Sequence, residues 1–286
     1  MNILILGGTG AIGTPLISIL LHNSEATVYV TSRSAHSSVK NIKYLQINAL
    51  DANALKNVLN LRHWDAIIDF MIYSNTVFKE RIDLLLNSTD QYFFLSSATE
   101  FSDADEIITE KTPRLLDITT DIELLMAQPY PINKALCENI LRSTDRANWT
   151  IVRPYITFNT NRLQLGCYEK EVWLWRCLCG GEVLFSKDIA QRYTTLTPAC
   201  DVAKAISLLI GNSKALGEDF TITTNQSMTW QEVLDIYRMV LLRERRISMR
   251  VKWAEESLNL RFQHGQWHAK YDRLYNRRFD NAKLMG

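Results

Sequence analysis

Residues 2–13, NILILGGTGAIG, decide the fold of this chain. The first five of them predict a short buried strand, and glycines follow it at positions 7, 10 and 13. Residues 12–21 then carry apolar side chains at helical spacing. A glycine turn between a strand and a helix suits an anion, because the backbone can approach closely and the helix start offers N–H groups. We expect it to bind the pyrophosphate of a dinucleotide, and the residues assigned to that contact are Gly7, Gly10, Ala11, Ile12 and Gly13.

The alternation of strand and helix continues along the chain. Further strands are predicted at residues 26–31, 43–47, 65–71, 91–96 and 149–153, with helices at 51–61, 75–86 and 130–141. Such alternation implies parallel pairing and a sheet covered on both faces. We therefore predict an α/β fold, a Rossmann-type doubly wound parallel sheet with a smaller, mostly helical C-terminal substrate lobe. Residues 1–160 and 191–224 are assigned to the dinucleotide-binding domain, and residues 161–190 and 225–286 to the lobe.

Composition excludes several classes of protein. Of 286 residues, 47% are hydrophobic, which is enough for a large core, and a net charge of +1 argues against a general nucleic-acid binder. No apolar run approaches the ~20 residues of a membrane span, and no basic segment opens a signal peptide. We expect a cytoplasmic protein without a membrane partner. The cysteines lack a paired metal spacing and are interpreted as free thiols, with no metal site: Cys137, Cys167, Cys177, Cys179 and Cys200.

The end of the second predicted strand bears on the choice of cofactor. An acidic residue there would bind the ribose 2′-hydroxyl of NAD. Residues 27–36 contain no Asp or Glu, but they include Arg33 between Ser32 and Ser34. An arginine at this place can pair with a 2′-phosphate. The sequence thus favours NADP as the cofactor, with NAD as the second choice and a solvated surface arginine as the alternative reading.

Two further motifs carry chemistry. Tyr130 and Lys134 are four residues apart on a predicted helix and so share one face. A cation beside a phenol favours the phenolate, which suits the tyrosine to moving the proton of a hydroxyl group. Ser96 and Ser97 end the strand predicted at residues 91–96. Ligands of parallel sheets bind beyond the carboxyl ends of the strands, so a serine there can hydrogen-bond the reacting oxygen.

In this order the motifs resemble the extended short-chain dehydrogenase/reductase family of nucleotide-sugar epimerases, dehydratases and reductases. The resemblance covers roughly residues 1–225 and rests on the glycine turn and on Ser96-Ser-Ala-Thr99, Ile108-Thr-Glu-Lys-Thr-Pro113, Tyr130-x-x-x-Lys134-x-x-x-Glu138, Arg153-Pro154 and Asp201-Val-Ala-x-Ala205. It implies that Ser97 is the catalytic serine, that Tyr130 is the acid/base, and that Lys134 binds the nicotinamide ribose and tunes the tyrosine. It also implies that Asp51 approaches the adenine.

The departures from the family pattern reduce the number of reactions that are expected. The dehydratases of the family carry an acidic pair where this chain has Ala98-Thr99, and Glu100 follows one position late. Dehydration is therefore disfavoured. Phe101-Ser102 replaces the usual Tyr-Gly, and the run Thr197-Pro-Ala-Cys200 stands where the family usually has a histidine before Asp201. These changes leave the substrate open.

We expect an NAD(P)-dependent oxidoreductase or epimerase that acts on a sugar nucleotide by tyrosine-assisted hydride transfer. The alternative from another class is a noncatalytic NAD(P)-binding regulatory or RNA-associated protein on the same fold, because fold does not fix function. The resemblance also implies a homodimer formed through the helices that precede and include Tyr130.

The C-terminal part offers weaker signals. Trp173 and Trp175 can stack on a base, although tryptophans at this spacing more often belong to a core. A basic cluster can bind a diphosphate or form a solvated helix face; its members are Arg243, Arg245, Arg246 and Arg250. His264 and His268 lie four residues apart but lack a third metal ligand. Tyr271-Asp-Arg273 and Arg278-Phe-Asp-Asn281 receive no chemical assignment.

Overall fold

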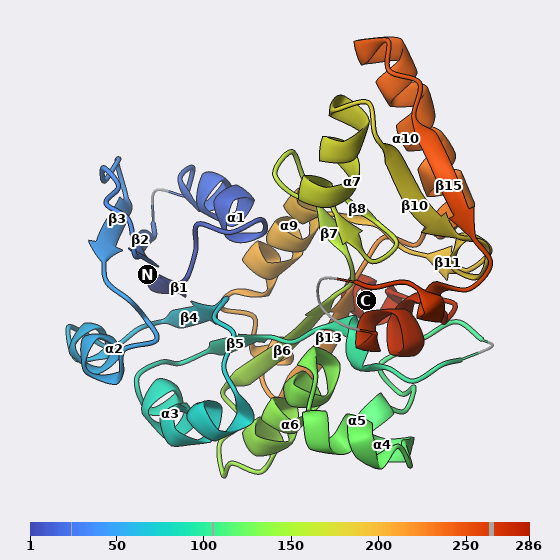
Figure 1. The fold of residues 1–286 in the computed structure, drawn as a ribbon. Helices are drawn as coiled ribbons and strands as arrows, with labels where there is room; N and C mark the ends of the chain where they lie inside the picture. The colour runs from blue at the N-terminus through green and yellow to red at the C-terminus, as the bar shows by residue number, and fades with distance from the viewer. Residues whose placement is uncertain (24, 105, 263–265) are drawn as a thin grey trace.

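The computed structural model describes residues 1–23, 25–104, 106–262 and 266–286. Its centre is a seven-stranded sheet in the order β13-β6-β5-β4-β1-β2-β3, and every pair of neighbours is parallel (Figure 1). The strands are β1 (Asn2–Leu6), β2 (Thr27–Ser32), β3 (Ile42–Gln46), β4 (Ala66–Asp69), β5 (Tyr92–Leu95), β6 (Trp149–Pro154) and β13 (Glu218–Ile222). The Rossmann-type, doubly wound α/β fold predicted from the sequence is confirmed.

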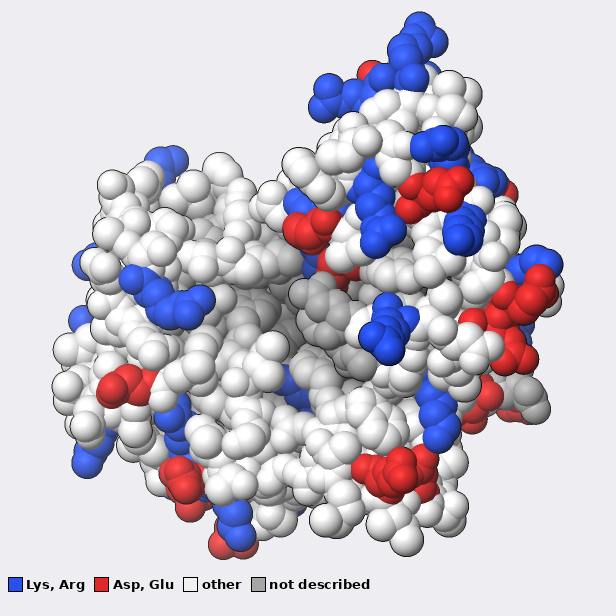
Figure 2. Space-filling view, viewed as in Figure 1, with Lys and Arg blue, Asp and Glu red and all other residues white. Residues whose placement is uncertain are grey.

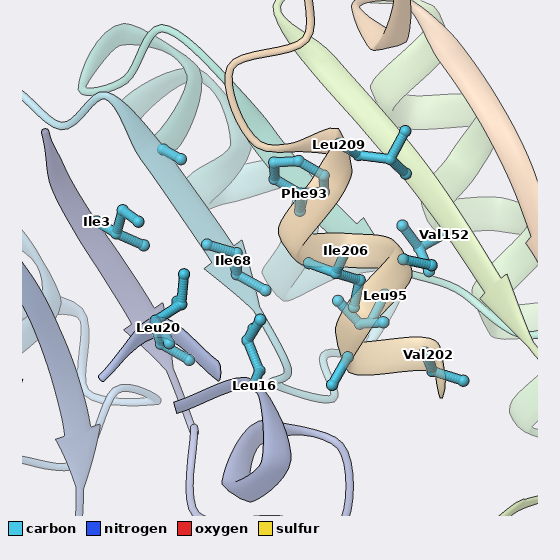
Figure 3. Packing of buried hydrophobic residues seen from close by; sticks show 14 of the residues in the cluster. Ile3, Leu16, Leu20, Ile68, Phe93, Leu95, Val152, Val202, Ile206 and Leu209 are labelled. Carbon is cyan, nitrogen blue, oxygen red and sulfur yellow. The ribbon is translucent and has the colours of Figure 1, made fainter. Parts of the chain in front are cut away.

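Alternate side chains of these strands fill two apolar layers, as expected for a sheet covered on both faces. On one face, α1 (Gly13–Leu20) and α9 (Ala199–Leu209) pack against the sheet, and Figure 3 shows Leu16 and Ile206 of these helices directed at Ile68. The opposite face is covered by α2 (Ala52–Leu59), α3 (Asn75–Asn87) and α6 (Tyr130–Arg142). Tyr92 and Phe94 of β5 belong to this second layer.

The edge strand β13 is an element that sequence reasoning missed. It follows Gly217, whose φ of +73° suits glycine, and it pairs with β6. The strand begins with two acidic residues, Glu218 and Asp219, so its apolar signal is confined to its last residues. Asp219 binds Arg142 and Arg153, and this ion pairing rather than apolar patterning marks the start of the strand.

The remaining elements build the lobe and the loops above the sheet. Its longer pieces are α7 (Lys170–Leu178), β10 (Glu182–Ser186), α10 (Trp230–Arg245) and β15 (Arg250–Ala254), and β10 pairs with β15 in parallel. Short strands are β7 (Thr157–Phe158), β8 (Gln164–Leu165), β9 (Tyr168–Glu169), β11 (Tyr193–Thr194), β12 (Thr197–Pro198) and β14 (Met228–Thr229). Short helices are η1 (Ala98–Glu100), α4 (Leu115–Ile118), α5 (Ile122–Ala127), α8 (Lys187–Ala190), η2 (Ser213–Ala215), η3 (Ser257–Asn259), η4 (Ala269–Arg273) and α11 (Ala282–Met285).

A third apolar cluster joins residues of the lobe, such as Trp173 and Trp230, to Phe101 and Tyr155 of the loops after β5 and β6. Trp173 is 2% exposed and stacks on Tyr237 with ring centres 4.5 Å apart, so the core interpretation holds for this tryptophan. Trp175, two residues on, is 64% exposed. Strand β11 pairs with β14 although the sequence assigns them to different parts of the chain. The boundaries of the two parts stay a prediction.

Within the described residues, no helix combines the length and the apolar character that crossing a membrane requires.

Candidate active site

The glycine turn joins β1 to α1, as predicted. Gly7 has a φ of +70°, a conformation open to glycine, and its N–H donates to the Thr31 hydroxyl of β2 at 3.0 Å. A Cβ on Gly13 would lie 2.2 Å from the carbonyl oxygen of Gly8, so this position admits no side chain. A Cβ on Gly10, by contrast, would meet nothing within 4 Å. The turn is therefore tightly packed at Gly13 and open at Gly10. This arrangement fits a pyrophosphate that rests on the backbone of the turn.

The residues assigned to the adenosine end lie beside this turn, at the carboxyl end of β2. Ser32 is buried, and its Oγ accepts from the Ser34 N–H at 3.2 Å and contacts His36 Nε2 at 3.1 Å. Arg33 is exposed. Asp51 is the N-cap of α2, where its carboxylate accepts from the Ala54 N–H at 2.8 Å. This hydrogen bond gives Asp51 a structural role as a helix cap that requires no contact with an adenine.

A cavity of about 830 Å³ opens between the carboxyl ends of the strands and the lobe. Figure 2 shows the molecule hollowed at this place. Of the predicted site residues, Ile12, Ser97, Tyr130 and Lys134 line it. The other predicted cofactor residues are not among the described residues that line the cavity: Gly7, Gly10, Ala11, Gly13, Ser32, Arg33, Ser34 and Asp51. Ile12 marks the point where the glycine turn meets the cavity.

Regular elements bring the three predicted catalytic residues to this cavity. Tyr130 is the first residue of α6, behind Pro129, and is 36% exposed. Lys134 follows one turn later, is 3% exposed, and places Nζ 5.7 Å from the centre of the Tyr130 ring. Ser97 comes directly after β5, and its Oγ lies 2.9 Å from the Thr99 hydroxyl. The arrangement places a phenol, an ammonium and a hydroxyl around one hollow.

The ammonium of Lys134 is fixed from below. Its Nζ donates to the Leu95 carbonyl at 2.6 Å and lies 4.7 Å from the centre of the Phe94 ring. Asp69, the register partner of Phe94 on β4, is 1% exposed. Its burial raises the pKa of the carboxyl group from 3.8 to about 6, although the charge of Lys134 and three hydrogen bonds oppose the rise. Sequence reasoning missed Asp69; its signal was an acid ending an apolar strand.

Glu100 is buried away from the cavity, in an ion pair with Arg153. The same guanidinium binds Glu138 of α6 at 2.5 Å and Asp219 of β13 at 2.5 Å. Burial and the nearby Glu138 hold the pKa of Glu100 well above its ordinary range. Burial would also raise the pKa of Glu138, but Arg153 lowers it. Glu100 therefore joins η1 to β6 and α6 through Arg153, and it is not among the residues that line the cavity.

The lobe side of the cavity contains residues that sequence reasoning noted but did not assign. The π-helical turn η4 directs Asp272 and Arg273 into the lining. Asp272 pairs with Arg273, accepts from Arg277 Nε at 2.8 Å, and accepts from the Tyr155 hydroxyl at 3.1 Å. Burial lowers the pKa of Arg277. Such a π turn has no period that a sequence pattern could reveal, which is why these residues escaped assignment.

Arg162 and Glu169 also line the lobe side of the cavity, and sequence reasoning missed them. Their side chains approach each other to 3.4 Å, and Arg162 Nη1 contacts the Thr157 hydroxyl at the same distance. Both distances are long for ion pairs and hydrogen bonds. Arg162 is 41% exposed, so its guanidinium is available to a ligand in the hollow.

The other weak C-terminal signals divide between the cavity and the tip of the lobe. The basic cluster sits at the far end of α10 and on β15, where Figure 2 shows Lys and Arg side chains at the tip of the lobe. His268 lines the cavity, whereas His264 lies outside the described residues. Across the described ranges, no group of three or more His, Cys, Asp or Glu side chains could hold a metal ion.

Solved structures with the same fold are numerous. UDP-glucose 4-epimerase from Thermus thermophilus, in complex with NAD, is 16% identical with a TM-score of 0.70, over 100% of this chain and 92% of the other. dTDP-glucose 4,6-dehydratase from Bacillus anthracis, also in complex with NAD, is 16% identical with a TM-score of 0.71, over 99% of this chain and 89% of the other. A mutant UDP-glucuronic acid 4-epimerase from Bacillus cereus is 13% identical with a TM-score of 0.71, over 99% of this chain and 91% of the other.

Comparison of the sequence itself gives a family but no individual relative. No curated protein matches the chain. Residues 3–223, which include the glycine turn, Ser97 and the Tyr130–Lys134 pair, match the family described as NAD dependent epimerase/dehydratase. With the parallel sheet and the glycine turn in place, the chain belongs to the NAD-dependent epimerase/dehydratase family, the extended branch of the short-chain dehydrogenases/reductases.

Proposed function

We propose that this protein is an NAD(P)-dependent enzyme that epimerises or reduces a sugar nucleotide. The observation that carries the proposal is the convergence of Ser97, Tyr130 and Lys134 on one cavity, beside a glycine turn that is open to a pyrophosphate. Structures of the same fold are named as UDP-sugar epimerases and as a dTDP-glucose dehydratase. The burial of Glu100 against Arg153 weighs against dehydration.

The chain's own residues supply binding and proton movement. The glycine turn would hold the pyrophosphate of the cofactor, and a bound nicotinamide would supply the acceptor or donor of hydride. The phenol oxygen of Tyr130 takes the proton of a sugar hydroxyl in the oxidising direction and returns it in the reducing direction. Ser97 donates a hydrogen bond to the same sugar oxygen and orients it. Lys134 places its ammonium 5.7 Å from the centre of the Tyr130 ring, where it stabilises the negative charge that develops on the phenol oxygen during proton transfer.

A panel of sugar nucleotides tests the proposal. The purified protein is incubated with UDP-glucose, UDP-N-acetylglucosamine, UDP-glucuronic acid and dTDP-glucose, and products are followed by NMR and mass spectrometry. An isomeric product without net change in NADPH absorbance identifies an epimerase, whereas stoichiometric consumption of NADPH identifies a reductase. RNA binding with a steep salt dependence and no turnover would support the noncatalytic alternative instead.

The variant Tyr130→Phe separates catalysis from binding. We expect kcat to fall by about 10²- to 10⁴-fold, because general acid/base groups contribute that much, while the cofactor still binds. The matched control is Tyr193→Phe, since Tyr193 has nearly the same exposure, 40%, and lies outside the described lining of the cavity. Wild-type activity of Tyr130→Phe would refute the role of this tyrosine.

For the cofactor, we propose a preference for NADP over NAD, supported by Arg33 and the absence of an acid between residues 27 and 36. A charge-assisted hydrogen bond contributes about 1.5–3 kcal/mol, so Arg33→Ala should weaken NADPH binding roughly 10- to 100-fold and leave NADH unchanged. Fluorescence titration of both cofactors measures this. Tighter binding of NADH that persists in the variant would point to NAD.

We also propose that the protein works as a cytoplasmic homodimer. Helices α3 and α6 lie side by side on one face of the sheet (Figure 1), and Leu136 and Ile140 of α6 are only half-buried there. All five cysteines are free thiols, in line with a reducing compartment. Light scattering should give twice the chain mass of 33.0 kDa; a mass of one chain would contradict the dimer.

A further inference from the structure

A buried polar cluster lies on the same face of the sheet as the proposed catalytic lysine. Asp69 ends β4 and is the register partner of Phe94, over whose ring the Lys134 ammonium is held at 4.7 Å. Partners in a parallel pair direct their side chains to the same face of the sheet. The carboxylate of Asp69, the ring of Phe94 and the ammonium of Lys134 therefore occupy one corner between β4, β5 and α6.

The carboxylate of Asp69 is held by three donors. The Tyr92 hydroxyl donates to Oδ2 at 2.9 Å, the Tyr73 hydroxyl donates to the same oxygen at 3.0 Å, and the Met71 N–H donates to Oδ1 at 2.9 Å. Both phenols are buried, Tyr92 fully and Tyr73 to 4% exposure. A buried carboxylate held by three donors has a fixed position, and its charge acts strongly because burial lowers the local dielectric constant.

We propose that Asp69 is a positioning residue of the active site, whose buried carboxylate supplies the negative charge that holds the Lys134 ammonium in place beneath Tyr130. The inference rests on the proposed function for its catalytic consequence, because Lys134 matters to turnover only if Tyr130 moves a proton. The placement itself does not depend on any substrate. Lys134 donates one hydrogen bond to the Leu95 carbonyl, and the positive charge of its ammonium lowers the pKa of Asp69, so the two buried groups attract each other.

The surroundings of Asp69 make it a group that changes charge near neutral pH. The titratable and charged groups facing this cluster are Tyr73 after β4, Arg81 of α3, Tyr92 of β5, and Lys134 and Cys137 of α6. Burial raises the pKa of both phenols and raises that of the Cys137 thiol to about 11, so these three stay neutral between pH 5 and 8. The pKa of Asp69 is about 6. Below this pH, Lys134 loses the opposite charge.

The first experiment observes the lysine directly, with no substrate. Protein labelled with ¹⁵N-lysine is titrated from pH 5 to 8, and the buried Lys134 ammonium signal is assigned by its loss in Lys134→Arg. We expect the signal to shift with a midpoint near pH 6. The shift should vanish in Asp69→Asn and persist in the control Asp65→Asn, which alters the acid just before the same strand. A Lys134 signal that ignores pH in this range would overturn the inference.

A second variant serves if Asp69→Asn does not fold. Tyr92→Phe keeps the carboxylate but removes a hydrogen bond that favours its charged form. The pH midpoint of the change in the Lys134 signal, which reports the Asp69 carboxyl, should therefore move above that of the wild type. An unchanged midpoint in this variant would show that the titrating group is not Asp69, and would overturn the inference.

Kinetics test the catalytic consequence. With whichever sugar nucleotide of the panel turns over, wild-type kcat should fall below pH 6, whereas Asp69→Asn should show a kcat about tenfold lower at pH 7, equivalent to about 1.4 kcal/mol in the barrier, without that acid limb. KM should stay nearly constant, because Asp69 lies outside the described lining of the cavity. An unaltered kcat and acid limb in Asp69→Asn would overturn the inference. If nothing turns over while Lys134 still responds to Asp69, the proposed function fails and the placement stands.

Discussion

The two sides of the cavity are built by different means. On the sheet side, Ser97, Tyr130 and Lys134 come from the ends of regular elements, which converge because parallel strands share one carboxyl edge. On the lobe side, Asp272 and Arg273 come from a π turn and are held by ion pairs and hydrogen bonds within the lobe and its loops. Backbone topology thus brings the proposed catalytic groups together, with the Asp69 charge acting only on Lys134, whereas side-chain charges position the lobe wall of the cavity.

This difference has a functional consequence. A sheet edge keeps its geometry when single side chains change, since the backbone ladder sets it. A wall that depends on buried charges can be reshaped by one substitution, and it suits a surface that distinguishes substrates. The substrate should therefore be determined mainly by the lobe side.

The largest expected effect is a loss of stability when an ion pair on the lobe side is broken. Asp272→Asn removes the carboxylate that pairs with Arg273 and with the fully buried Arg277. Breaking a buried pair typically costs about 3–5 kcal/mol, so the free energy of unfolding should fall by that amount in urea denaturation. The control Asp235→Asn breaks an exposed pair with Arg238 and should change it by less than about 1 kcal/mol. Equal stability of the two variants would mean that charge does not hold the lobe side.

A smaller effect belongs to the sheet side and depends on pH. The pKa of Asp69 is raised by burial from 3.8 to about 6, so the folded state binds this proton more tightly than the unfolded chain. The contribution to stability is therefore fully present below pH 3.8 and is lost as pH rises to 6, by about 3 kcal/mol. Asp69→Asn should flatten this part of the profile of unfolding free energy against pH. A wild-type profile that rises steadily from pH 4 to 6, with the variant parallel to it, would contradict the shift.

Most of the fold was predictable from the sequence because its signals are local. The run at residues 2–13 combines an apolar strand, spaced glycines and a helix start, and six of the seven strands are marked by apolar residues. The strand β13 is not, because ion pairs of Asp219 replace apolar patterning at its start.

The candidate site was predictable only on the sheet side. Ser97, Tyr130 and Lys134 lie at positions that strand and helix spacing reveals, and they do line one cavity. Asp272 and Tyr155 are 117 residues apart in the chain and meet only through the tertiary fold. No periodicity encodes such a contact, and the same holds for the pairing of Asp69 with Tyr92.

The smallest expected effect concerns the glycine turn on the sheet side, where two substitutions separate the contribution of packing from that of cofactor binding. In Gly13→Ala the new Cβ would lie 2.2 Å from the Gly8 oxygen and 2.6 Å from its carbonyl carbon, so the turn must shift, and overpacking of this kind costs about 1–3 kcal/mol. Gly10→Ala meets nothing within 4 Å and should leave thermal stability almost unchanged. Its methyl group projects into the open space above the turn, so NADPH binding should weaken by fluorescence titration while folding is intact. Undiminished binding in Gly10→Ala would place the pyrophosphate elsewhere, because a dinucleotide lying on this turn has no room for the methyl group.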